Sequence, residues 1–472
     1  MGITKKISAN SWFESAKASS FLLLLFSFIP SINIAFNFGA YDTIRSSENL
    51  EVILFIIQGI IGLAFGITFF APLWAGLPLK TENDFISFRY SGKYLTPLKN
   101  TRSILLGVFI IPLLMALVIK NPLEIFKEYG LSNQILYCTV FTFLCLYGLK
   151  NSFQQRLKLD FLMGIFFLMA CLISIVFLLQ SSELSHVKIP INTKSIAKSN
   201  IIFVVLIGWW FANIVDFPDM RAQKLLSASS NKTGYFSFLF GNGLIMVIQG
   251  VFICLYALFR FHSSTTVEIL CLSILIVSCI VQLMNLQHWS GSLMHTFFRE
   301  SISNQRIRNF IPMVISIVIA YLICLLTESI FNIIQGILFF TAGVGPVYIL
   351  RWVYYRVNAI TQLTAMISSL VLGLTYIFLK NFNLFNFSAF TVFNLSTTNS
   401  AIVIIGLINC LTWGVVMLAS QREEENKLAK ERIQQIHANL QYNVSVKTFQ
   451  FILTAFLLLL LFFGPYLLLI GI

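Results

Sequence analysis

Long apolar runs, each close to the length that crosses a bilayer, are the feature that most constrains how this chain can fold. A transmembrane helix needs about 20 mainly apolar residues, with a range of about 17–25. Hydrophobic residues make up 57% of the chain and charged residues 11%, whereas a soluble protein carries about 25% charged residues. About thirteen runs are close to this length, the fourth being short: 18–40, 51–77, 102–119, 134–149, 159–180, 199–216, 234–259, 267–288, 309–327, 331–350, 358–379, 400–419 and 448–470. The sequence therefore predicts an all-α integral membrane protein with about thirteen transmembrane helices.

The placement of the 32 Lys and Arg residues predicts the orientation of these helices. With a cytoplasmic N-terminus, the inner segments carry about three times as many of these residues as the outer segments, as the positive-inside rule requires. The chain is then a multi-pass protein of the plasma or bacterial inner membrane, surrounded by lipid. Its net charge of +13 is spread over short loops, so it forms no compact basic platform for nucleic acid.

Motifs of enzyme chemistry are missing from the sequence. It contains no HExxH, GxSxG or P-loop motif, which would indicate a zinc peptidase, a serine hydrolase or a nucleotide-hydrolysing motor. The five histidines are scattered, and the eight cysteines lie within apolar runs without a CxxC pair, where they are expected to pack as small hydrophobic residues. The sequence therefore predicts neither an enzyme nor a bound cofactor.

The first apolar run is interrupted near its middle. Pro30 cannot donate a backbone hydrogen bond and clashes with the preceding turn, and Asn33 and Asn37 follow on one helical face. A helix that breaks at this depth frees carbonyl groups that can coordinate a cation. The alternative is a simple proline kink whose freed groups are satisfied by the hydroxyls of Ser27 or Ser31. Both interpretations remain open from the residues alone.

The sixth run contains a second polar stripe. Trp209, Asn213 and Asp216 share one helical face, and Trp210 lies beside them. An aspartate is costly at the centre of a bilayer, but Asp216 is near the inner end of its run. We expect it to reach water or to pair with Arg221. Asp160, at the inner edge of the fifth run, is expected to form a surface ion pair with Lys158, while Trp210 could stack on a ligand or face lipid.

Single polar residues mark several other runs. The eighth run carries Ser278, Gln282 and Asn285 on one face. Gln58, Asn242, Gln249 and Gln335 stand alone in the second, seventh and tenth runs. Such groups must find partners inside the helix bundle, so they are either interhelical hydrogen-bonding residues or part of a ligand site. We take Asn33, Asn37, Gln58, Trp209, Trp210, Asn213, Asn242 and Gln335 as the candidate substrate-binding residues.

Two segments outside the apolar runs have patterns of their own. In 351–370, Arg351 and Arg356 flank three aromatic residues, which is typical of a cytoplasmic membrane edge with cations among the lipid headgroups. The segment 420–447 is highly charged and is predicted to form a surface helix. It is either an inner connector that extends the twelfth helix or a surface that binds a partner.

Four ordered blocks resemble the bacterial branch of the sodium:solute symporter family. They are NSWF with the interrupted first run and FNFGAY (10–41), FFAPLWAGLPLKTENDFISFRYSGK (69–93), WWFANIVDFPDMRAQKLLSASSNK (209–232) and RWVYYRVNAITQLTAMISSL (351–370). They follow the family's order and spacing over roughly residues 10–380. The chain departs from the family pattern in places, for example in having Lys224 where the family has an arginine.

The resemblance implies a LeuT-like fold with a 5+5 inverted repeat in a single transporter domain over 1–472. The first repeat would span 18–180, the second 199–350, and three additional helices would occupy 358–472. Substrate would bind near the midplane, between the interrupted first and sixth helices. A sodium ion would be held by carbonyls around Pro30 and Asn33 and by Ser278, the last in a register that puts Ser278 and Cys279 at the family's hydroxyl pair.

These observations predict a secondary active transporter that takes up a small polar solute with sodium by alternating access. The alternative is a transporter-fold protein that has lost transport and acts as a membrane sensor or partner subunit. The candidate binding residues are neutral amides and aromatic rings, which favours neutral polar solutes such as sugars.

Overall fold

Helices make up the architecture of the computed structural model. It describes residues 18–31, 60–127, 152–180, 216, 219–261, 265–297, 305–327, 330–382, 384, 395, 397–421, 423–438 and 450–460. The first part contains α1 (Phe21–Phe28), η1 (Ile29–Ser31), η2 (Gly66–Phe70), α4 (Ala71–Gly76), α5 (Glu82–Arg89), α6 (Leu95–Ile104), η3 (Leu105–Ile110), α7 (Ile111–Lys127) and α9 (Phe153–Gln180). The second contains α11 (Met220–Leu226), α12 (Asn231–Phe261), α13 (Thr265–Phe297), α14 (Gln305–Leu326), α15 (Ile330–Thr341), α16 (Gly345–Leu350), α17 (Ala359–Asn381), α18 (Thr397–Ala419) and α19 (Glu423–Ala438).

Six helices in the described residues are long and apolar enough to cross a membrane. They are Leu95–Lys120, Phe153–Gln180, Asn231–Phe259, Thr266–Met294, Ala359–Asn381 and Thr397–Ala419, and each coincides with a predicted apolar run. Shorter apolar helices cover parts of five other predicted runs. The chain is thus a multi-pass membrane protein, while the total of about thirteen spans stays a prediction because several runs lie partly or wholly outside the described residues.

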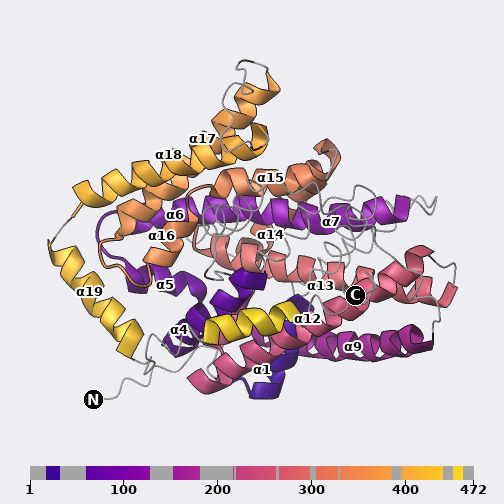
Figure 1. The fold of residues 1–472 in the computed structure, drawn as a ribbon. Coiled ribbons are helices and arrows are strands. Elements are labelled where there is room, and N and C mark those ends of the chain that lie inside the picture. The colour runs from indigo at the N-terminus through magenta and orange to yellow at the C-terminus, as the bar shows by residue number, and fades with distance from the viewer. Residues whose placement is uncertain are drawn as a thin grey trace.

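The long helices lie in stacked layers (Figure 1). Helices α17 and α18 form one edge, α1 and α9 form the opposite edge, and α7, α13 and α14 lie between them. Leu162, Leu172, Val176 and Leu179 on α9 remain exposed, as expected for a helix face that meets hydrocarbon. The central layers therefore supply the interior of the bundle.

The α-helical geometry of the first run changes at Ile29, immediately before Pro30. Helix α1 ends at Phe28 and continues as the short 3₁₀ segment η1. The hydroxyl of Ser27 donates to Leu24 O at 2.8 Å, and that of Ser31 donates to Phe28 O. The start of α1 is joined to the end of α11 by backbone bonds from Ser19 N to Ser227 O (3.0 Å) and from Ser229 N to Ser19 O (3.2 Å). The interrupted first run and the segment after the sixth run are thus held side by side.

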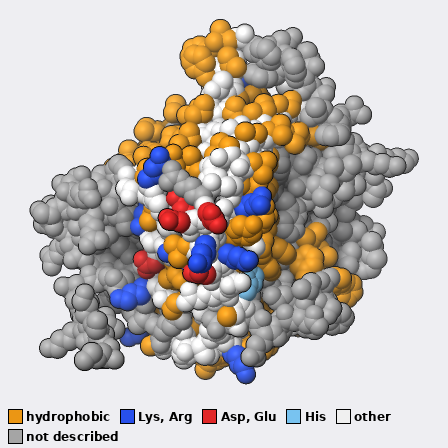
Figure 2. Space-filling view, turned by 90° about the vertical axis from the view of Figure 1, so that its left-hand side faces the viewer, with side chains coloured by type: hydrophobic (Ala, Val, Ile, Leu, Met, Phe, Trp, Pro, Cys, Tyr) orange, Lys and Arg blue, Asp and Glu red, His pale blue; other side chains and the backbone are white. Residues whose placement is uncertain are grey.

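Helix α19 corresponds to the charged segment predicted within 420–447. It is a separate helix and not a continuous extension of α18, which ends at Ala419. It packs against α4 and α5, Arg432 donates to Tyr90 O at 3.0 Å, and His437 Nε2 lies 2.9 Å from Trp352 O. Figure 2 shows acidic and basic side chains gathered on this side of the molecule, next to apolar bands. The helix therefore contacts its own chain, and partner binding by its outer face stays a prediction.

The turn between α15 and α16 depends on Gly343 and on a polar anchor from α18. Gly343 has φ 77°, and a Cβ at this position would lie 2.6 Å from Gly406 O. The side chain of Asn409 is buried, and its Nδ2 donates to Ala342 O (2.7 Å) and Ala365 O (3.1 Å). This amide joins the turn to both α17 and α18.

We expect Asn409→Leu to destabilise the purified protein by about 1–3 kcal/mol, because two buried carbonyls lose their donor. The measurement is the melting temperature in detergent. Thr412→Val is the matched control, since Thr412 is exposed and its hydroxyl donates within its own helix, to Ile408 O. Equal melting temperatures for the two variants would show that the amide does not hold the turn.

Candidate substrate-binding cavity

A cavity of about 340 Å³ lies where the interrupted first run meets α7, α11, α12 and α13. This volume falls within the range of about 300–1,000 Å³ that is usual for small-molecule sites. The wall is apolar on the α7 side, where Leu114, Leu117 and Val118 line it. Polar side chains come from the other elements: Ser31 from η1, Asn242 and Gln249 from α12, and Gln282 and Asn285 from α13. The cavity thus combines an apolar surface with a few convergent polar groups.

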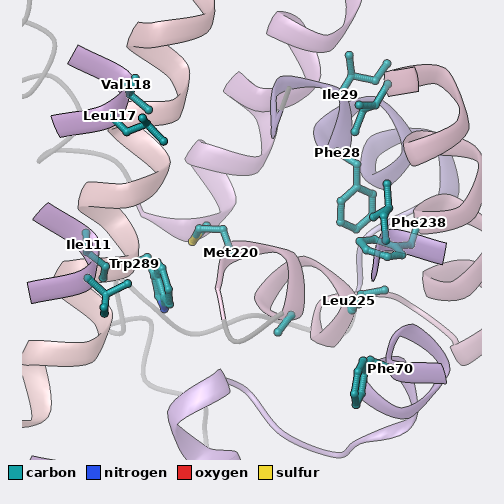
Figure 3. Close-up of a cluster of buried hydrophobic side chains, with 14 of the residues drawn as sticks. Phe28, Ile29, Phe70, Ile111, Leu117, Val118, Met220, Leu225, Phe238 and Trp289 are labelled. Carbon is teal, nitrogen blue, oxygen red and sulfur yellow. The ribbon is translucent and has the colours of Figure 1, made fainter. Parts of the chain in front are cut away.

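Further parts of the wall come from the segment 219–224 and from Trp289, and the apolar side chains of Leu63, Ile245, Met246 and Leu286 also line it. Asp219, Met220, Arg221 and Lys224 line the cavity from the start and inner face of α11. Figure 3 shows Met220 and Trp289, on α11 and α13, together with the buried rings of Phe28 and Phe238. These two rings meet edge to face with centroids 4.9 Å apart. The aromatic contact packs α1 against α12.

The structure places part of the predicted site. Asn242 lines the cavity, and Pro30 lies directly before the lining residue Ser31. Ser278 is buried on α13, where Gln282 Nε2 donates to its hydroxyl at 3.4 Å. Gln335 lies half-buried on α15 and is not among the described residues that line the cavity. The other candidates lie outside the described residues: Asn33, Asn37, Gln58, Trp209, Trp210 and Asn213.

A buried cluster of three charges reaches the cavity wall through Lys224. Lys224 Nζ is 2.9 Å from Asp160 Oδ2 and donates to Ser27 O at 2.5 Å. Arg156 Nη2 lies 3.3 Å from Asp160 Oδ1, and Arg156 Nε donates to Asn285 Oδ1 at 3.2 Å. Lys224 and Arg156 are each 2% exposed and Asp160 is fully buried. The cluster joins α1, α9, α11 and α13 near the end of α1.

The prediction for Asp160 was wrong. It does not form a surface pair with Lys158, which is exposed, but a buried pair with Lys224 from a distant helix. Asp160 faces inward because it lies on the face of α9 that also buries Arg156, four residues earlier. An Arg and an Asp four residues apart near the start of the helix were a signal that the sequence did contain.

A second buried network, centred on Asp216, lies next to the 351–357 turn. Asp216 Oδ2 accepts from Arg351 Nε (2.8 Å), Arg351 Nη2 (2.5 Å) and Trp352 Nε1 (2.7 Å). The backbone carbonyl of Asp216 accepts from Trp74 Nε1 at 2.6 Å. The network links α4, the segment before α11 and the turn after α16.

Two predictions about this network were wrong. Asp216 does not pair with Arg221, whose guanidinium instead contacts Asp219 at 2.6 Å. Arg351 and Trp352 do not lie among lipid headgroups, because both are fully buried. Arg351 and Trp352 can be buried because the Asp216 carboxylate accepts hydrogen bonds from both side chains. Without this partner, the two side chains would need lipid headgroups or water.

Helix α5 is held against these elements by further arginines. Arg89 Nε donates to Arg351 O at 2.7 Å, and its Nη2 donates to Tyr354 O and Val357 O. Arg102 forms a buried ion pair with Glu82. Burial raises the pKa of the Glu82 carboxyl, and the nearby positive charge of Arg102 opposes this rise. The segment between α4 and α6 is therefore fixed to the turn that follows α16.

Comparisons with known proteins identify the fold. No family model matches the chain, and no curated protein matches it. A solved Na⁺-coupled sialic acid symporter in a substrate-bound outward-open state is similar, with a TM-score of 0.56 and 12% identity, over 86% of this chain and 92% of that one. A nucleobase-cation-symport-1 family transporter in a closed conformation with bromovinylhydantoin bound gives a TM-score of 0.52 and 11% identity, over 89% and 99% of the two chains. The chain therefore has the all-α, LeuT-like fold of these transporters.

Proposed function

We propose that this protein is a secondary active transporter that takes up a small polar solute by alternating access, with sodium as the coupling ion. The observation that carries the proposal is the cavity between the interrupted first run and helices α7, α11, α12 and α13. In transporters built from inverted repeats, interrupted helices at the midplane supply the backbone groups that bind substrate and ion. The two solved structures of the same fold are described as a Na⁺-coupled symporter and a nucleobase-cation-symport transporter, which supports the proposal.

The proposed site combines residues of the cavity with candidates from the sequence. Solute would contact Asn242 and the candidates Asn33, Asn37, Gln58, Trp209, Trp210, Asn213 and Gln335. Sodium would bind near Pro30, Asn33 and Ser278, and this part of the proposal is supported by the packing of α13 against η1. We also propose two repeats over 18–180 and 199–350, three further helices over 358–472, a cytoplasmic N-terminus and a lipid-facing surface.

Uptake into proteoliposomes tests the proposal. The purified protein is reconstituted and offered labelled sugars, sugar acids, amino acids and nucleobases, with and without an inward sodium gradient. Accumulation of one solute that depends on the gradient supports sodium-coupled transport. Accumulation driven equally well without sodium contradicts the choice of coupling ion. Binding of a solute without accumulation would instead favour a membrane sensor that has lost transport.

Substitutions in the interrupted first run should impair transport more than insertion. We expect Pro30→Ala and Asn33→Ala to lower uptake at least tenfold, the effect of about 1.4 kcal/mol in binding, while the amount of protein in the membrane changes little. In the same assay, Ser278→Ala should raise the sodium concentration needed for half-maximal uptake. Thr375→Val is the matched control, because Thr375 is exposed on α17, away from the cavity wall, and its hydroxyl donates within its own helix, to Val371 O. Normal uptake per inserted molecule in the Pro30 and Asn33 variants would contradict the proposed binding site in the first run.

A further inference from the structure

The described residues of the cavity wall carry more positive than negative charge, and we propose that the solute is a small organic anion with one carboxylate group. The inference rests on the proposed function and names the substrate class for the same cavity. It differs from the neutral solutes that the candidate residues favoured, because the burial of Lys224 beside the cavity was not predicted from the sequence.

Within the described part of the chain, the charges around the cavity leave one positive charge without a carboxylate of its own. Among the described lining residues, the charged ones are Asp219, Arg221 and Lys224. Asp219 and Arg221 neutralise each other through contacts of 2.6–3.1 Å. Asp160 lies between Lys224 and Arg156, at 2.9 and 3.3 Å, so one carboxylate serves two buried cations.

The neighbouring parts of the sequence supply no further carboxylate. Residues 32–41, which continue from Ser31, and residues 199–215, which precede Asp216, contain no charged side chain. Asp216 itself is occupied by Arg351 and Trp352. A buried charge without a counter-charge is costly. A bound carboxylate beside Lys224 would supply that counter-charge inside the cavity.

Hydrogen-bond donors point to the same ligand chemistry. A lysine ammonium has three donors and no acceptor. Lys224 donates one hydrogen bond to Ser27 O and lies 2.9 Å from Asp160 Oδ2. The indole N–H of Trp289 is buried, lines the cavity and has no acceptor among the described residues. The side-chain oxygen of Asn285 accepts a hydrogen bond from Arg156. Asn285 can therefore bind a ligand by donating from its amide N–H groups. Three donors and an excess positive charge fit the acceptor-only oxygens of a carboxylate.

Matched pairs of acids and neutral analogues test this assignment on the purified full-length protein. The probes are gluconate and glucose, lactate and lactamide, and nicotinate and nicotinamide, and the readout is the dissociation constant from a thermal-shift titration. We expect at least one acid to bind more tightly than its neutral partner. Lys224→Met should weaken binding of that acid by roughly 10- to 100-fold, the usual worth of a hydrogen bond to a charged group, without weakening its neutral partner.

Two further variants keep the test informative if Lys224→Met does not fold. Trp289→Phe retains the ring but removes the donor, and it should weaken binding of the acid by roughly 2- to 10-fold, as expected for one hydrogen bond. Lys232→Met removes a lysine that is exposed at the start of α12, and it should leave the affinity for the acid unchanged.

The outcomes separate this inference from the proposed function. The anion assignment is overturned if no acid binds more tightly than its neutral partner, or if both cavity variants bind the acid as well as the unmodified protein does. An acid that binds but is not accumulated by proteoliposomes contradicts the transport function and leaves the anion assignment standing.

Discussion

Arg351→Met should destabilise the protein by about 3–5 kcal/mol, the usual cost of leaving one member of a buried ion pair without its partner. Arg351 and Asp216 are both fully buried, and the guanidinium donates twice to the same carboxylate oxygen. The guanidinium also lies over the rings of Tyr348 and Phe85, at 4.2 and 4.9 Å from their centroids. The variant loses both the ion pair and this packing. The measurement is the denaturation midpoint of the protein in detergent.

The double variant Arg351→Met with Asp216→Asn separates the ion pair from the packing. Removing both charges should recover part of the lost stability, because no unpaired charge is then buried. Arg356→Met is the matched control. Its side chain contacts the Tyr355 hydroxyl at 3.4 Å and it is not part of the buried network, so it should change the midpoint little. If the single and double variants were equally unstable, lost packing and not the buried charge would explain the effect.

Gly164→Ala should strongly impair folding or transport, because α1 crosses α9 at this residue. A Cβ on Gly164 would lie 2.1 Å from Phe26 O and 2.9 Å from Phe26 C, both backbone atoms that cannot rotate away. Overpacking of this kind costs about 1–3 kcal/mol or more, although alanine is favoured over glycine in a helix by about 1 kcal/mol. Steric conflict therefore predicts that Gly164→Ala lowers the stability of the protein, whereas helix propensity predicts that it raises it.

The contrast with Gly243→Ala makes this prediction decisive. Gly243 also lies inside a long helix, α12, but a Cβ there meets no atom within 4 Å. That variant should be as stable as the unmodified protein or slightly more so. For Gly164→Ala we expect a lower denaturation midpoint and a matching loss of uptake, since the shift of α1 would move the break that borders the cavity. Indistinguishable behaviour of the two variants would mean that α1 and α9 do not approach as closely as in the structure.

The membrane class and the individual long helices were predictable because they depend on local composition. Apolar residues over a span such as 267–288 leave the backbone no alternative to a helix within lipid, whichever helices surround it. Pro30 likewise ends regular α-helical geometry through its own covalent structure, and α1 ends two residues before it. The side-chain partners across the bundle were the part that could not be predicted in this way.

The sequence by itself determined a multi-pass helical membrane protein whose first run leaves regular α-helical geometry next to Pro30, because hydrophobic length and proline chemistry act within a few residues. Only the tertiary structure decided which charges meet. Asp216 pairs with Arg351 across 135 positions, and Asp160 pairs with Lys224 instead of the nearby Lys158. Interaction between charges depends on their distance in space and on their exclusion from water, and neither quantity is set by separation along the chain.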